Sequence, residues 1–154
     1  ADSVAEVQPS RSITPGSNMR AIIDLRTNRK EELVDITARV EQAVLESGVR
    51  DGLVSVYAQG ATAAIMIQEN WDASVPTDVV NFLAKIIPPG VWLHDQQDNN
   101  GDAHIKAGLV GPSESIPIIG GRLGLSTWQG IFLCEFDGPR SSRRVVCTML
   151  GERE

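Results

Sequence analysis

Residues 115–150 read SIPIIGGRLGLSTWQGIFLCEFDGPRSSRRVVCTML, and this stretch decides the fold. Runs of β-branched and apolar residues alternate in it with turn signals such as Gly120-Gly121. The runs that we expect to form strands are 115–119, 122–125, 128–136 and 145–150. Strands separated by short glycine-containing turns are typical of antiparallel pairing, so this part of the chain predicts a β meander.

The chain before this stretch mixes strands with helices. Its apolar runs predict strands over 19–25, 53–58 and 62–67. Its helical periodicity, caps and stops predict helices over 36–47, 77–87 and part of 103–110. Because the two kinds of element do not alternate regularly, we expect an α+β fold, a single compact domain of largely antiparallel β sheet with two or three helices packed on it. Residues 1–16 are interpreted as an N-terminal arm with an edge strand near 12–14, and 17–154 as the domain.

Length, charge and hydropathy exclude some classes of function. A chain of 154 residues fits one domain. Its net charge of -6 argues against nucleic-acid binding, which needs a basic face. Arg140, Arg143 and Arg144 can still form a local anion pocket. No apolar stretch approaches the ~20 residues that span a bilayer, and the signal-peptide pattern is missing, so we expect a cytoplasmic protein with no membrane partner.

The two cysteines, Cys134 and Cys147, do not form a C-x-x-C pair. A hairpin centred between Arg140 and Ser141 would place them opposite each other. A cytosolic setting favours buried free thiols there over a disulfide.

Residues 92–106, WLHDQQDNNGDAHIK, hold both histidines among acidic and amide side chains. Imidazole and carboxylate groups suit a divalent metal, and a neutral histidine also suits acid–base chemistry. We therefore take His94 and His104 as candidate catalytic residues, and His94, Asp98 and His104 as candidate metal ligands. The alternative is a solvated turn with His104 capping the next helix, since the spacing matches no closed zinc signature.

Three polar residues, Gln68, Glu69 and Asn70, come together at the end of the apolar run 62–67. A strand would aim them rigidly, which makes Glu69 a further catalytic candidate and Asn70 a substrate-binding candidate. The alternative is a polar strand end that enters a loop.

Several of these segments resemble the YjbQ family, small proteins some of which act as secondary thiamine-phosphate synthases. The most specific is 113–131, SESIPIIGGRLGLSTWQGI, followed by Cys134, Glu135, Asp137, Gly138 and the pair Arg143-Arg144. Residues 103–111, AHIKAGLVG, are similar to another family stretch, and Asp35-Ile36-Thr37 to the start of its first helix. The resemblance runs from about Asp35 to Glu152, with Ser126 in place of a family glycine.

One departure concerns the chemistry. Family members usually carry His-Thr-Thr/Ser-Ala where this chain has Gly60-Ala61-Thr62-Ala63, and some carry a second histidine where it has Asp102. Losing a general acid or base commonly costs ~10² to 10⁴ in rate. An active enzyme and a decayed relative are both consistent with this sequence.

The resemblance implies a transferase that joins hydroxymethylpyrimidine pyrophosphate to thiazole phosphate and releases pyrophosphate. Arg143 and Arg144 would contact phosphate oxygens, with Lys106 as a point charge and Gln129 as a further substrate contact. The resemblance also implies a homotrimer with sites at subunit boundaries. A divalent metal, Mg²⁺ or Zn²⁺, would assist the phosphates.

Two other functions remain open. A metal-dependent phosphoester hydrolase would use the histidine segment as its ligand set. A non-catalytic trimer would bind a phosphorylated metabolite. In each case the partner is a phosphorylated small molecule.

Overall fold

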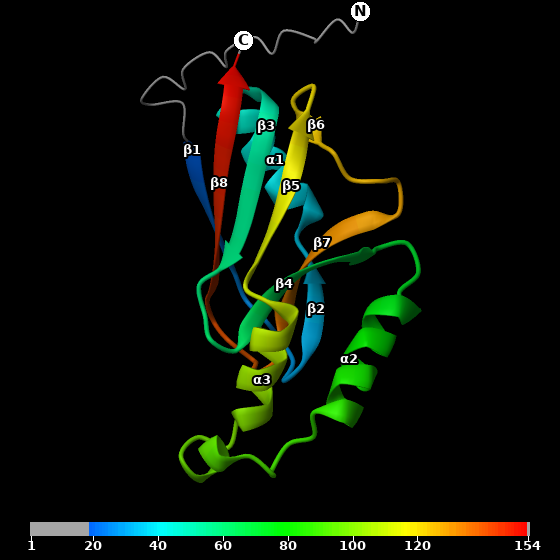
Figure 1. Cartoon of the computed structure of the whole chain (residues 1–154), viewed down its shortest axis with the longest axis vertical. Coiled ribbons are helices and arrows are strands. Elements are labelled where there is room, and N and C mark those ends of the chain that lie inside the picture. Colours follow the sequence, from blue (N-terminus) through cyan, green and yellow to red (C-terminus); the bar gives the residue numbers. More distant parts are fainter. Residues whose placement is uncertain (1–18, 154) are drawn as a thin grey trace, which may run out of the picture.

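The computed structural model describes residues 19–153, which form two antiparallel sheets and three α-helices (Figure 1). The larger sheet has the order β1 (Met19–Leu25), β8 (Arg143–Arg153), β3 (Val49–Ala58), β5 (Ser113–Ile119) and β6 (Arg122–Leu123). The smaller sheet has the order β2 (Glu32–Asp35), β7 (Gln129–Glu135) and β4 (Ala63–Glu69). The helices are α1 (Thr37–Ser47), α2 (Ser74–Ile86) and α3 (Gly101–Val110), with a short 3₁₀ helix η1 (Leu93–Gln96) before α3. The predicted α+β class and antiparallel pairing are confirmed.

Two apolar cores hold these layers together. The first lies between the larger sheet, α1 and one face of the smaller sheet, where Val54, Val145 and Ile65 are fully buried. The second lies on the other face of the smaller sheet, where Ala64 and Cys134 pack with residues of α2 and α3. The central strand β7 is therefore buried on both faces, which explains its continuous apolar run.

The helix boundaries follow the chain's capping signals, with shifts at the starts of α1 and α2. α1 begins at Thr37, one residue after the predicted start, and the Asp35 carboxylate accepts the backbone N–H of Thr37 at 2.9 Å. The helix is followed by Gly48, whose φ is 72°. α2 begins at Ser74 rather than after Thr77. Asp72 accepts the Ser74 N–H at 2.9 Å, and Pro76 fits the first turn, where no intrahelical N–H donor is required.

The predicted meander is wrong at its last two steps, because β7 lies in the smaller sheet and pairs with neither β6 nor β8. β7 and β8 do not form a hairpin, because residues 136–142 carry the chain from the smaller sheet to the larger one. Cys134 therefore lies beside Leu33 and Ala64, whereas Cys147 lies between Ala21 and Val56. Both thiols are free and buried. Burial raises the pKa of Cys134 to about 12 and that of Cys147 to about 11.

Two further expectations concern the N-terminal arm and membrane spans. The N-terminal arm 1–16, with its edge strand near 12–14, lies outside the described residues. Within 19–153, no helix is long and apolar enough to cross a membrane.

Candidate functional site

Polar side chains from the β3–β4 loop, from the residues around the start of α3 and from the start of β8 gather around one cavity. They line a pocket of about 500 Å³ that we call the arginine pocket. Its wall includes Gly60, Thr62, Asp98, Asn100, His104, Arg140, Arg143 and Arg144. Three arginines, one from the connection before β8 and two from the start of that strand, thus line a single cavity in a protein of net charge -6.

Arg143 is the most firmly held of the three arginines. Its Nε and Nη2 donate to the two carboxylate oxygens of Glu135 at 3.0 and 2.5 Å, and Nη2 also donates to the Thr62 hydroxyl at 2.8 Å. Burial alone would raise the pKa of Glu135, but hydrogen bonds from Arg143, Thr27 and the Asp137 backbone hold that pKa below its usual range. The pair is therefore ionised, and it fixes the guanidinium plane.

The remaining nitrogen of Arg143 points toward Gly60. A Cβ atom built on Gly60 would lie 2.9 Å from Nη1, closer than van der Waals contact allows. A glycine at this position thus allows the close approach of Arg143. Gly60 itself lies in the β3–β4 loop and is exposed.

A second charged group anchors the opposite wall. Asp137 accepts hydrogen bonds from Lys30 at 2.5 Å, from Arg140 at 2.9 Å and from the side-chain amide of Asn100 at 2.9 Å. Burial alone would raise the pKa of Asp137, but these three donors together hold it below its usual range. Asn100 is buried, and its Oδ1 has no hydrogen-bond partner among the described residues. Leaving such an acceptor unsatisfied costs about 1–3 kcal/mol.

The two histidines lie together, as the sequence indicates. Their rings meet edge to face with centroids 4.7 Å apart, and His104 lines the arginine pocket from the first turn of α3. His104 is therefore not the cap of that helix. Nε2 of His94 is 3.5 Å from the Asp98 carboxylate, yet it makes no hydrogen bond within the described chain.

The proposed metal ligands are not arranged as a cation site. Among residues 19–153, no group of three His, Cys, Asp or Glu side chains is placed to hold a metal ion. His94, Asp98 and His104 share one region but do not share a ligand point.

Lys106 does not have the role expected of it. Its side chain is 0% exposed, and its ammonium donates to Glu31 at 2.5 Å and to Asp102 at 2.8 Å. Burial alone would lower the pKa of Lys106, but hydrogen bonds to Asp102 and Glu31 raise it. Because two carboxylates already surround this charge, Lys106 joins α3 to the loop before β2 and is not free to bind phosphate.

Glu69 and Gln129 lie far from the histidines. The two are paired across β4 and β7 at the opposite end of the smaller sheet. Seven residues of extended chain separate Glu69 from Thr62 on the pocket wall, a distance of roughly 23 Å. Within a single chain, the catalytic candidate Glu69 therefore does not lie in the same cavity as the catalytic candidate His104.

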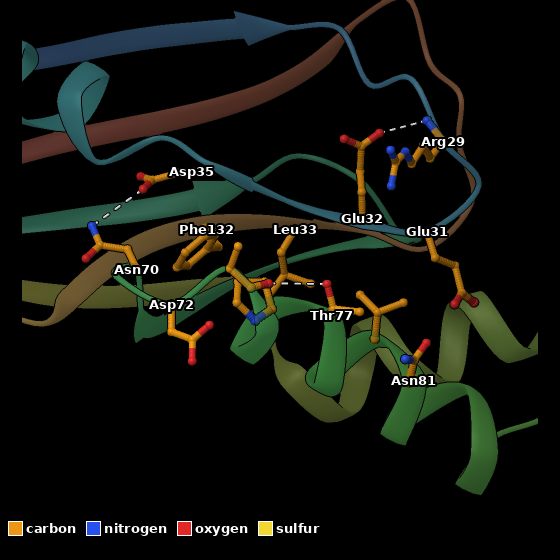
Figure 2. Close-up of a pocket in the computed structure, with 13 residues that line it drawn as sticks. Arg29, Glu31, Glu32, Leu33, Asp35, Asn70, Asp72, Thr77, Asn81 and Phe132 are labelled. Carbon is orange, nitrogen blue, oxygen red and sulfur yellow. Dashed lines mark hydrogen bonds between the residues drawn. The ribbon is translucent and has the colours of Figure 1, made fainter.

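Asn70 lies on a different groove, of about 560 Å³, between β2 and α2 (Figure 2). Its amide is 3.5 Å from the Asp35 carboxylate, and the two side chains face each other at one end of the groove. The acidic side chains that line this groove are Glu31, Glu32, Asp35 and Asp72, whereas Arg29 is the one basic side chain of its described lining. The charge balance disfavours phosphate there, so the arginine pocket is the better candidate anion site.

Sequence reasoning missed the buried supports of this pocket. Glu135 and Asp137 were noted only within the family resemblance, and Thr27 was not noted at all. The signal was a carboxylate at the end of the fully apolar run 130–134, because a buried carboxylate requires an ionic partner.

Comparison with known proteins places this geometry in a family. The family model described as "UPF0047 protein YjbQ-like" matches residues 21–152. This chain belongs to the YjbQ-like UPF0047 family. It is 46% identical over 129 residues to the UPF0047 protein MJ1081 of Methanocaldococcus jannaschii, with 84% of this chain and 92% of the relative covered. It is 37% identical over 136 residues to the UPF0047 protein YugU of Bacillus subtilis, with 86% and 100% covered.

Solved structures of YjbQ-like proteins share the fold. A YbjQ-like protein of unknown function from Sulfolobus solfataricus superposes with a TM-score of 0.85 at 36% identity, covering 88% of this chain and 98% of the other. An uncharacterized conserved member from Clostridium acetobutylicum gives 0.80 at 43% identity, covering 84% and 99%. The family assignment therefore rests on sequence and structure together, while the activity of the family is not given by these relatives.

Proposed function

We propose that the chain is a transferase of the thiamine-phosphate synthase type, which binds hydroxymethylpyrimidine pyrophosphate in the arginine pocket and joins its pyrimidine to thiazole phosphate. The observation that carries the proposal is the convergence of Arg140, Arg143 and Arg144 on one cavity. Forked guanidinium donors match phosphate oxygens, and fixed cations stabilise the charge that develops on a leaving pyrophosphate as its C–O bond breaks.

The three arginines have different parts in this proposal. Arg143 is preorganised by Glu135 and Thr62, with Nη1 directed toward Gly60 and the cavity. Arg144 is exposed and makes no ion pair within residues 19–153, so its full charge is available to a ligand. Arg140 is partly neutralised by Asp137 at 2.9 Å. We assign the main phosphate contacts to Arg143 and Arg144.

His104 is the acid–base candidate of this pocket, because it lines the cavity together with the arginines. His94 contacts its ring and orients it. The divalent metal, Mg²⁺ or Zn²⁺, remains a prediction from the sequence. The described side chains do not fit a preformed ion, so no step is assigned to one and the hydrolase alternative gains no support.

We further propose that the functional unit is a homotrimer in which a neighbouring subunit brings Glu69 and Gln129 to the arginine pocket. These residues cannot reach it within their own chain. Exposed apolar side chains support burial by another copy, since Trp71 is 77% and Leu93 is 91% exposed. Light scattering at micromolar concentration should return a trimer mass, and a monomer would contradict the shared site.

A non-catalytic function as a binder of a phosphorylated metabolite is favoured by one observation. Gly60 supplies no imidazole, and Arg143 approaches the space where a side chain would begin. The two functions differ in turnover. The purified protein is incubated with both phosphorylated substrates, and thiamine phosphate and pyrophosphate are quantified together.

Equimolar formation of both products supports the transferase. Pyrophosphate binding without turnover would support the binder. Release of inorganic phosphate without thiamine phosphate would support a hydrolase and contradict both.

A further inference from the structure

Asn100 presents a buried acceptor that the proposed phosphate chemistry does not use. The side chain lies at the position before α3, it lines the arginine pocket and it is 9% exposed. Its Oδ1 has no hydrogen-bond partner among residues 19–153. Buried acceptors in native proteins are nearly always satisfied by a protein group or an ordered water, so an unpaired one beside a binding pocket points to a donor from outside the described chain.

The orientation of the Asn100 amide is fixed by its neighbours. Nδ2 donates to Asp137 at 2.9 Å, and the same carboxylate accepts from Lys30 and Arg140. An ionised carboxylate only accepts hydrogen bonds, so the amide cannot turn its oxygen toward Asp137. The Asn100 backbone is also held, since its carbonyl accepts the N–H of Ala103 at 3.1 Å. Oδ1 is therefore locked as the atom left over.

The pocket thus offers two kinds of recognition side by side. The guanidinium groups supply positive donors for phosphate, whereas Asn100 supplies one neutral acceptor. A phosphate or pyrophosphate group that is fully ionised has no hydrogen to donate to that acceptor. A bare phosphate compound would satisfy the arginines and leave Asn100 unpaired.

We infer that Asn100 is a specificity-determining residue whose Oδ1 accepts a hydrogen bond from an N–H or O–H group on the non-phosphate part of the ligand. The inference rests on the proposed function, because it takes the arginine pocket to hold the phosphorylated substrate. An exocyclic amino group on a heteroaromatic ring is the donor that fits best. Its N–H groups donate, and its nitrogen does not itself need a donor because its lone pair is delocalised into the ring. A ring hydroxyl offers the same chemistry and is tested in parallel.

The test measures how much the donor group contributes to binding. Calorimetric titration uses inorganic pyrophosphate and three pyrimidinylmethyl phosphates, which carry an amino group, a hydroxyl group or hydrogen at the same ring position. The wild-type protein should bind the amino compound about fivefold more tightly than the hydrogen compound, as one hydrogen bond contributes. In Asn100→Ala this ratio should fall to about one, while pyrophosphate affinity changes by less than about twofold, because Nδ2 of Asn100 already donates to Asp137 and Oδ1 receives no hydrogen from an ionised phosphate.

Asn81→Ala is the matched control, because Asn81 lines the separate groove between β2 and α2. It should keep the wild-type ratio for every compound. If the hydroxyl compound alone shows the preference, the donor is an O–H rather than an N–H and the acceptor assignment holds.

The outcomes separate this inference from the proposed function. Equal wild-type affinity for the amino, hydroxyl and hydrogen compounds would overturn it without any variant, even if pyrophosphate binds normally. Equal loss of all four ligands in Asn100→Ala would also overturn it and assign Asn100 a structural role. Loss of Mg²⁺ or Zn²⁺ binding in that variant would make Oδ1 a metal ligand instead. Failure of pyrophosphate to bind the wild-type protein would refute the proposed function and this inference with it.

Discussion

Replacing Gly60 with histidine is expected to raise turnover at least about tenfold over the alanine variant at the same position, about 1.4 kcal/mol of barrier. The alanine variant separates crowding from chemistry. A Cβ at position 60 meets Nη1 of Arg143 at 2.9 Å, whereas ordinary contact begins at 3.4 Å. The guanidinium must therefore retreat by about 0.5 Å (3.4 minus 2.9) in both variants.

The retreat is resisted because Arg143 is held by hydrogen bonds to Glu135 and Thr62. Both variants should bind pyrophosphate more weakly than the wild type and to the same extent, because both displace Nη1 of Arg143 from its position beside residue 60. The backbone at Gly60 is not left-handed, so alanine and histidine are both tolerated there.

The assay is steady-state formation of thiamine phosphate, with pyrophosphate affinity measured separately by calorimetry. The histidine variant should gain in kcat, because the added imidazole supplies an acid or base beside the phosphate contacts. Equal turnover of the histidine and alanine variants would refute a catalytic duty for this position. No turnover in the wild type or in either variant would favour the non-catalytic binder.

Further predictions concern the buried charges. Glu135→Gln should lower the free energy of unfolding by about 3 kcal/mol in urea denaturation, because it leaves Arg143 as an uncompensated buried charge, and a loss below about 1 kcal/mol would contradict the ion pair. Lys106→Met should lower the free energy of unfolding by a similar amount, about 3 kcal/mol, and should change pyrophosphate affinity by less than about twofold. A large loss of pyrophosphate affinity in a variant that stays folded would show that Lys106 is a phosphate contact after all. The folded-state pKa values of Glu135 and Asp137 lie below those of the unfolded chain. The stabilisation from these carboxylates is therefore complete above about pH 4 and is lost as the pH falls through the folded-state values. The melting temperature should drop below about pH 4 but not between pH 5 and 7. Native Cys134 and Cys147 should react with a thiol reagent at pH 8 far more slowly than the unfolded protein, and rapid reaction of two thiols would contradict their burial.

Local sequence signals predicted individual elements well. β1 matches the predicted range 19–25, since a short apolar run between polar turns has few alternatives. The end of α1 was predicted correctly at Gly48, whose left-handed backbone stops a helix, and its start was predicted to within one residue. β2 was missed because four residues with charged ends, Glu32–Asp35, carry no periodic signal.

Pairing and contacts between segments far apart in the sequence could not be predicted from local signals. Hairpin signals placed β7 beside β8, but a longer connection crosses between sheets, so Cys134 and Cys147 are in separate sheets. The pairing of Lys106 with Glu31 likewise joins residues that are 75 positions apart. The neighbourhood of the histidines was predicted because His94 and His104 are close in sequence. The separation of Glu69 from them within one chain was not predicted, because it is set by the length and placement of β4.

Calorimetric titration of pyrophosphate tests the central proposal, an anion site in the arginine pocket, most directly. Arg144→Ala is compared with Arg122→Ala, which removes the same charge from an exposed arginine on β6, outside the pocket. We predict that the wild type binds pyrophosphate, that Arg144→Ala weakens this binding at least about tenfold and that Arg122→Ala weakens it by less than about twofold. The reason is that a charged hydrogen bond to the ligand contributes far more than a screened charge elsewhere on the surface. No binding by the wild type, or equal weakening in both variants, would contradict the assignment of the arginine pocket.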